Sequence, residues 1–119
     1  MATYAIRYIE LPNGDVCDFG LFGIPYGTCG TAATTQAKVV TISGIATLRE
    51  GLSIRVKFKT AQHYNGTPTL NLNSLGAKSI YRNGATPAKQ YEWATGDVLD
   101  LVYDGTNWII VNGGALKIS

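Results

Sequence analysis

The strongest constraint on the fold lies near the C-terminal end of the chain, in the segment Val98–Asn112. Two apolar runs, each about as long as one strand, flank the four residues Asp104-Gly105-Thr106-Asn107. Each run is too short to be stable as a free-standing helix, and Asp-Gly supplies the positive-φ position that a chain reversal needs. The segment therefore predicts a β-hairpin, and the fold has to contain a sheet.

A second segment, 52–59, alternates between apolar and polar residues without a break. Its apolar members are Leu52, Ile54, Val56 and Phe58. Because side chains on a strand point alternately to opposite faces, these four residues are predicted to form one wall of the core. The basic residues Arg55, Lys57 and Lys59 would share the solvated outer face.

The rest of the chain indicates an all-β protein. Short strand-like runs at Lys38–Ile42, Leu70–Asn73 and Ala77–Tyr81 are separated by Gly, Asn and Pro, and Thr31–Gln36 has room for one helical turn at most. Short strands spaced about ten residues apart are typical of a small antiparallel β-sandwich or barrel. We therefore expect such a domain over residues 26–119.

Residues 1–25 are predicted to form an N-terminal hairpin, or arm, followed by a connector. Strand-favouring residues up to Leu11 are followed by the turn Pro12–Asp15 and by Val16–Phe19. The connector Gly20–Gly27 mixes large apolar residues with Gly and Pro, so it is not expected to be regular. Its apolar groups would dock on another copy or a neighbouring protein, or would pack across the sheet edge.

Composition favours a single soluble-type domain with a weakly charged surface. The chain has 119 residues, of which 15% are charged, against about 25% in an average protein. The net charge of +2 is scattered, which argues against nucleic acid as a partner, and no apolar run is long enough for membrane insertion. Cys17 and Cys29 match no metal or redox spacing and could pair or stay free. Because we recognise no secretion signal, we expect reduced thiols.

The sequence carries no catalytic motif that we recognise. His63 is the single histidine, and no nucleophile or ligand cluster lies beside it. Glycoside cleavage needs two suitably placed carboxyl groups, and the eight acidic residues stand in no recognisable motif. We therefore expect a protein that is not an enzyme and that uses no metal and no cofactor.

Aromatic residues in predicted loops are the better functional signal. Sugar rings stack on Tyr and Trp while polar side chains meet their hydroxyl groups, and Lys89 and Gln90 supply further polar groups nearby. The predicted ligand-binding residues are His63, Tyr64, Asn65, Tyr81, Arg82, Asn83, Tyr91 and Trp93. For Tyr81 and Trp93, packing in the core or between subunits is the alternative, and Trp108 is expected in the core.

The stretch from Tyr26 to Gly113 resembles a small β-domain that recurs in tail-fibre and baseplate proteins of phages and prophages. The order and spacing of several motifs carry this resemblance, and no one motif does so alone. The motifs are Tyr26-Gly-Thr-Cys-Gly-Thr-Ala-Ala33, Lys38–Val40 with Ser43-Gly44, Val56–Phe58, Pro68-Thr-Leu-Asn-Leu-Asn73, Gly76-Ala-Lys-Ser-Ile-Tyr81 and Tyr103-Asp-Gly-Thr-Asn-Trp108.

The resemblance implies a virion component, assembled in the bacterial host cytoplasm, that contacts the host surface in trimeric assemblies. We therefore expect a non-enzymatic receptor-binding module for host attachment that binds cell-surface glycan. Its partners would be further copies of the chain, through Leu21–Tyr26 and the arm, and other virion proteins. The alternative is a structural virion connector, or a head or tail decoration protein without ligand binding. A depolymerase remains a third possibility.

Overall fold

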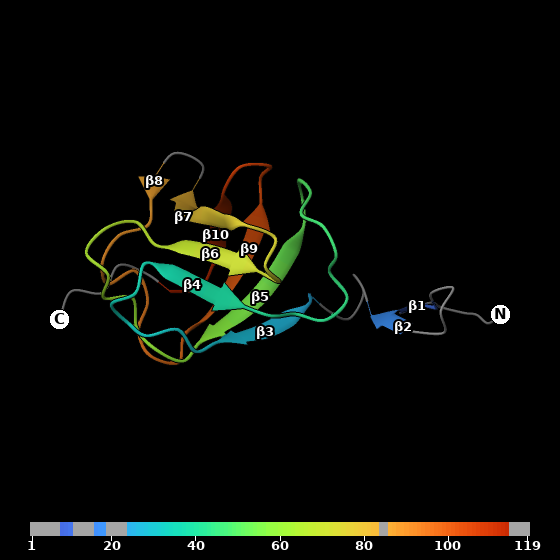
Figure 1. Ribbon diagram of the computed structural model, residues 1–119, viewed down its shortest axis with the longest axis horizontal. Coiled ribbons are helices and arrows are strands. Elements are labelled where there is room, and N and C mark those ends of the chain that lie inside the picture. The colour runs from blue at the N-terminus through green and yellow to red at the C-terminus, as the bar shows by residue number, and fades with distance from the viewer. Residues whose placement is uncertain (1–7, 11–15, 19–23, 84–85, 115–119) are drawn as a thin grey trace.

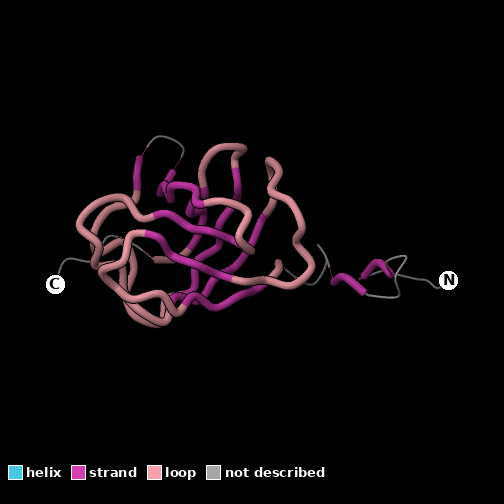
Figure 2. Tube along the Cα trace, in the orientation of Figure 1, coloured by secondary structure: helices cyan, strands magenta, loops and turns pink. Residues whose placement is uncertain are grey.

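The computed structural model describes residues 8–10, 16–18, 24–83 and 86–114, with side chains from residue 24 onward. The described residues form ten strands and no helix, which confirms the all-β prediction (Figures 1 and 2). A two-stranded sheet pairs β1 (Tyr8–Glu10) with β2 (Val16–Asp18) in antiparallel fashion, as predicted for the N-terminal hairpin. This hairpin lies apart from the main sheet in Figure 1.

The main sheet has eight strands and is nearly closed into a barrel. Its strand order is β3-β5-β9-β10-β7-β6-β4, and β8 adds to β7. The strands are β3 (Tyr26–Cys29), β4 (Ala37–Val40), β5 (Ser53–Phe58), β6 (Thr69–Leu72), β7 (Ala77–Asn83), β8 (Thr86–Pro87), β9 (Val98–Tyr103) and β10 (Trp108–Asn112).

The sheet is mixed, whereas an antiparallel one was predicted. Three ladders are parallel: β3 with β5, β4 with β6, and β7 with β10. Parallel partners need a crossover connection of about a dozen residues or more, and here other strands of the same sheet form those connections. A period-two pattern shows which face is buried but not the direction of the neighbouring strand.

The inward side chains of the strands build one core. In β5, Ile54, Val56 and Phe58 are buried and Leu52 packs against the core from its edge, so the predicted wall is confirmed. Arg55, Lys57 and Lys59 are exposed on the outer face, and Arg55 pairs there with Asp100 at 2.6 Å. Trp108 is buried, as predicted, with its ring centroid 5.3 Å from that of Tyr103.

The predicted C-terminal hairpin is confirmed by the antiparallel pairing of β9 with β10. Its turn residue Gly105 has a φ of 100°. The Asp104 carboxylate accepts hydrogen bonds from the backbone N–H groups of Asn107 and Thr106, at 2.7 and 2.8 Å. These bonds hold the pKa of Asp104 below its usual value.

The two end strands of the sheet, β3 and β4, meet without a hydrogen-bonded ladder between them, and we call this junction the seam. A Cβ added to Gly27 of β3 would lie 2.6 Å from Cγ1 of Ile42 and 2.9 Å from Cγ2 of Val40. The side chains of Val40 and Ile42 therefore pack directly against the backbone of Gly27. Beyond Gly27, Thr31 Oγ1 accepts a hydrogen bond from the backbone N–H of Val39 at 3.0 Å.

A lysine is buried beside the seam. Lys38 is 1% exposed, and its ammonium donates to the carbonyl oxygens of Ala32 and Ala33, at 3.1 Å each. Burial lowers the pKa of Lys38, because the charged form loses hydration. Cys29, on β3, is a buried free thiol.

Some sequence predictions fall outside the described part of the chain. They include the side chain of Cys17, Phe19 at the end of the predicted hairpin, and residues 20–23 of the apolar connector. Among the described residues, no helix is long and apolar enough to cross a membrane.

Gly27→Ala is predicted to destabilise the protein by about 1–3 kcal/mol, because Val40 and Ile42 would have to move away from the new methyl group. Gly30→Ala is the matched control, since its Cβ would meet only Lys59 Cδ at 3.8 Å. Urea denaturation measures both. Equal stability of the two variants would show that the seam does not depend on the missing side chain.

Val56→Asp is predicted to unfold the barrel, because a buried unpaired charge costs several kcal/mol against a total stability of about 5–15 kcal/mol. Lys57→Asp places the same residue on the exposed face one position later and should leave the fold intact. Circular dichroism and melting temperature distinguish them. A soluble Val56→Asp protein with an unchanged melting temperature would contradict the description of this core.

Candidate functional site

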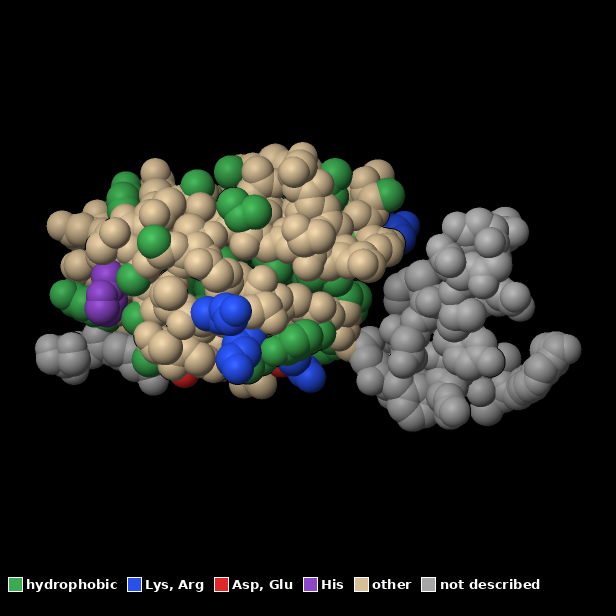
Figure 3. Space-filling view, turned by 60° about the horizontal axis from the view of Figure 1, so that its bottom comes forward, with side chains coloured by type: hydrophobic (Ala, Val, Ile, Leu, Met, Phe, Trp, Pro, Cys, Tyr) green, Lys and Arg blue, Asp and Glu red, His purple; other side chains and the backbone are tan. Residues whose placement is uncertain are grey.

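A groove of about 530 Å³ lies at one end of the barrel, between the loop 65–67 and the segment 87–91. Its lining residues are Asn65, Gly66, Thr67, Pro87, Ala88, Lys89, Gln90 and Tyr91. The single histidine, purple in Figure 3, is at the left-hand end of the barrel in that view. The groove volume falls in the range of about 300–1,000 Å³ usual for small-molecule sites.

The two walls of the groove are joined by a buried glutamine, Gln62. Its Oε1 accepts the backbone N–H of Tyr64 at 3.2 Å, and its Nε2 donates to the Tyr64 carbonyl at 2.9 Å. The same Nε2 lies 3.3 and 3.4 Å from the carbonyl oxygens of Gly66 and Lys89, one from each wall. Gln62 therefore fixes the spacing of the walls before any ligand arrives.

A buried carboxylate, Glu92, supports the wall formed by the segment 87–91. Its Oε1 accepts the backbone N–H of Lys89 at 2.9 Å, and its Oε2 accepts Nε of Arg82 at 2.6 Å. Arg82 also donates from Nη1 to the carbonyl of Gly113 at 3.0 Å. The Arg82 guanidinium therefore cross-links three parts of the chain and is not among the residues that line the groove, and its predicted ligand-binding role stays a prediction.

The prediction of Trp93 as a stacking platform is wrong, because its ring is buried in the core. Trp93 is 0% exposed, and its ring centroid lies 4.1 Å from that of Phe58. Its indole N–H donates to the carbonyl of Thr60 at 3.1 Å, which satisfies the buried polar group. The core alternative stated for this residue is the one observed, and Trp93 anchors the end of the segment 87–91 in the core.

Tyr91 is the exposed aromatic residue of the groove. It is 36% exposed and has a φ of 68°, a conformation that is an outlier for a bulky side chain. Its backbone N–H donates to the carbonyl of Gln62 at 2.7 Å. The His63 ring meets the Tyr91 ring edge-on, with centroids 5.5 Å apart, and Gln90 Nε2 donates to the His63 carbonyl at 3.0 Å.

Other predicted residues lie around this groove in different roles. Asn65 lines it, and Tyr64 packs behind it, because a Cβ on Gly66 would lie 2.9 Å from the Tyr64 ring. Tyr81 pairs with Pro87 across the β7–β8 ladder, so both side chains share a face of that ribbon next to the groove. Asn83, which pairs with Thr86, is exposed at the end of β7.

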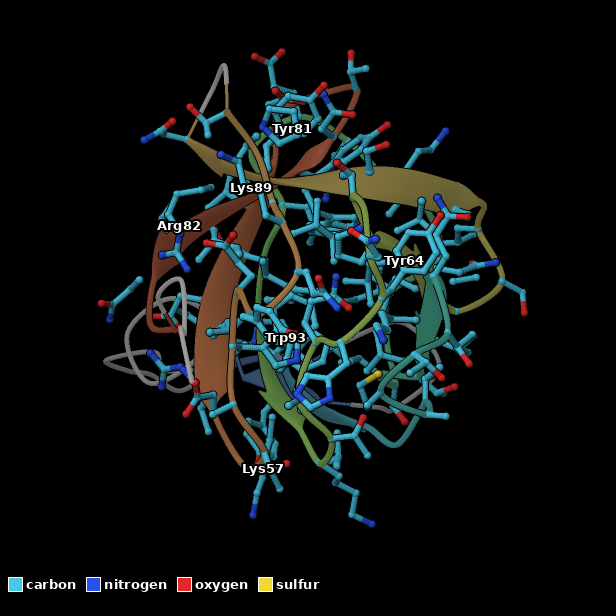
Figure 4. All side chains as sticks on the ribbon, turned by 90° about the vertical axis from the view of Figure 1, so that its left-hand side faces the viewer. Lys57, Tyr64, Tyr81, Arg82, Lys89 and Trp93 are labelled. Atoms are coloured by element: carbon cyan, nitrogen blue, oxygen red, sulfur yellow. The ribbon has the colours of Figure 1, made fainter. Side chains whose placement is uncertain are left out.

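Figure 4 looks toward this end of the barrel and shows how the labelled side chains divide. Tyr64 lies on one side of the chain segment that carries Lys89 and Trp93, and Arg82 lies on the other. The structure therefore brings His63, Tyr64, Asn65 and Tyr91 together, with Tyr81 at the border.

Sequence reasoning missed the residues that shape the groove, Gln62 and Glu92, and did not include Thr67 or Pro87 in its lining. Gln62 follows no periodic pattern, so nothing in the sequence distinguishes it from a solvated loop glutamine. Glu92 carries one usable signal, since an acidic residue three positions after Lys89 can accept that residue's backbone N–H.

The groove offers a chemically mixed surface. Among its lining residues, Asn65 and Gln90 carry amides, Thr67 a hydroxyl, Lys89 an ammonium and Tyr91 a phenol ring, and Gln90 Nε2 also donates to the His63 carbonyl. An aromatic face beside several polar groups suits a ligand that has both apolar and hydroxylated faces. Among the described residues, no group of three or more His, Cys, Asp or Glu side chains is placed to hold a metal ion.

No protein-family model and no curated protein matched this chain in comparisons.

Gln62→Leu is predicted to cost about 1–3 kcal/mol, because the substitution leaves the part-buried N–H of Tyr64 without its partner and removes the Nε2 contacts to the carbonyl oxygens of Gly66 and Lys89. Hydrogen exchange at the Tyr64 amide should accelerate. Gln36→Leu is the control, since its amide makes one exposed hydrogen bond to Thr67. If both variants behave like the parent protein in urea denaturation and exchange, Gln62 does not hold the walls together.

Proposed function

We propose that this chain is a non-enzymatic phage virion module, in a tail fibre or baseplate, that attaches to host-surface glycan through the groove. The observation that carries the proposal is Tyr91, an exposed aromatic residue on a strained backbone that lines the groove together with polar residues. Strained backbone persists where the surroundings over-determine it and concentrates at functional sites. The resemblance of the stretch from Tyr26 to Gly113 to a β-domain of phage tail-fibre and baseplate proteins supports the phage assignment.

The lining chemistry supports glycan as the ligand. A sugar places its apolar C–H face on an aromatic ring while its hydroxyl groups exchange hydrogen bonds with amides and hydroxyls. The Tyr91 ring, the amides of Asn65 and Gln90 and the hydroxyl of Thr67 supply these partners from both walls. Because Gln62 and Glu92 fix the walls, binding would cost little ordering of the protein.

A single open groove of this size would bind weakly, so the proposal includes several copies acting together. We propose a homotrimer within the virion, with other virion proteins as further partners. Linked sites raise overall avidity by about 10²–10⁴ without new contacts when the geometry permits simultaneous binding.

The second candidate function is a structural virion connector, or a decoration protein. Two side chains favour it: Tyr26 and Val39 are 52% and 53% exposed, on the two strands of the seam. Large apolar groups on an outer face are typical of contacts with other proteins. In this alternative the seam surface would be covered in the virion and the groove would stay empty.

Tyr91→Asn is predicted to weaken glycan binding about tenfold while preserving the fold, because it removes the ring and Asn tolerates positive φ. Val111→Asn is the control, because Val111 is an exposed apolar residue on β10 outside the groove lining. The measurements are binding to an array of bacterial surface polysaccharides and adsorption to host cells.

Binding that survives Tyr91→Asn in a folded protein would place the glycan site elsewhere. A parent protein that binds no polysaccharide, but whose assembly into virions is disrupted by Tyr26→Asn, would establish the connector function instead.

A further inference from the structure

We infer that the groove selects an anionic glycan, a sugar that carries a carboxylate or phosphate group, and that Lys89 recognises this group. The inference rests on the proposed function, since it names the class of glycan for the same groove. Lys89 is the one charged side chain among the eight lining residues. A ligand group of opposite charge would therefore gain an attraction that a neutral sugar lacks.

Within the part of the chain that the structure describes, no ion pair neutralises the charge of Lys89. Among the described residues, ion pairs join Arg55 to Asp100 and Arg82 to Glu92, and Lys89 takes part in neither. The nearest carboxylate in the chain sequence is Glu92, which is buried and turned toward the Arg82 guanidinium and the Lys89 backbone N–H. The exposed Lys89 ammonium is thus left for solvent or a ligand.

The backbone that carries Lys89 is held in place although its side chain is exposed. Its N–H donates to Glu92, and its carbonyl lies 3.4 Å from the buried Nε2 of Gln62. Lys89 is also two residues from Tyr91, so the ammonium and the stacking ring belong to one fixed segment. The inference requires that a sugar stacked on Tyr91 present its anionic substituent to Lys89, and both residues line the same groove.

A lysine meets either a carboxylate or a phosphate, because its ammonium is a compact point charge with three rotatable donors. The gain expected is modest, since a solvent-exposed ion pair contributes up to about fivefold in affinity and is screened by salt. Lys89 therefore sets a preference among glycans, while Tyr91 and the amides supply the general affinity for sugars.

The test compares three soluble polymers: polygalacturonate, poly(glycerol phosphate) and neutral galactan. Binding is measured by calorimetry at low and high salt for the parent protein, Lys89→Gln and Lys57→Gln. Lys57 is the matched control, because it is an exposed lysine outside the groove lining, and it lies at the lower edge of Figure 4, apart from Lys89. The two charged polymers distinguish carboxylate from phosphate recognition.

The expected result is tighter binding of at least one charged polymer than of galactan by the parent protein at low salt. Lys89→Gln should reduce that binding three- to fivefold and leave galactan binding unchanged, whereas Lys57→Gln should change neither. Equal binding of charged and neutral polymers would overturn the inference and leave the proposed function standing. Equal losses in the two variants would also overturn it, because they would indicate general charge attraction.

If none of the three polymers binds and the polysaccharide array is also negative, the proposed function itself fails, and the inference fails with it. If the array identifies neutral glycans that depend on Tyr91 but not on Lys89, only the anionic selectivity is overturned.

Discussion

The rest of the structure depends on the close approach of β3 and β4 at Gly27. Without a Cβ at this position, the side chains of Val40 and Ile42 pack on the β3 backbone, and the sheet is nearly closed into a barrel. The inward side chains of the main strands share one core, and the two end strands meet by side-chain packing without a ladder between them. Where the strands diverge, Thr31 Oγ1 and the Lys38 ammonium provide the hydrogen bonds that a ladder would otherwise make.

The core in turn determines the geometry of the groove. Trp93 stacks on Phe58 and donates to the Thr60 carbonyl, so the segment that carries Lys89 and Tyr91 is attached directly to the core. The buried groups of Gln62 and Glu92 fix the same segment from two further directions. These attachments explain how a tyrosine can be held at a φ of 68° on the surface.

The parts of the fold that the sequence predicted are those encoded locally. The alternation around Val56 and the turn at Asp104 each depend on a few consecutive residues, and both were predicted correctly. The parallel ladders depend on strands far apart in the chain, so no local pattern reports them. The same distinction applies to the groove: residue type and loop position pointed to Asn65 and Tyr91, which line it, but not to the ion pair of Arg82 with Glu92 or to the burial of Trp93.

The three parallel ladders also determine how quickly the barrel can form. The β9–β10 hairpin joins neighbouring segments, and such hairpins form in about 1–10 μs. By contrast, β3 must find β5, and β4 must find β6, across long stretches of chain, which is the topology of domains that fold in milliseconds to seconds. Until these late pairings close the seam, Val40, Ile42 and the unpaired edges of β3 and β4 are open to other chains. Nascent copies that meet during this interval can exchange strands, so the slow closure of the seam limits how concentrated the newly made protein can safely become.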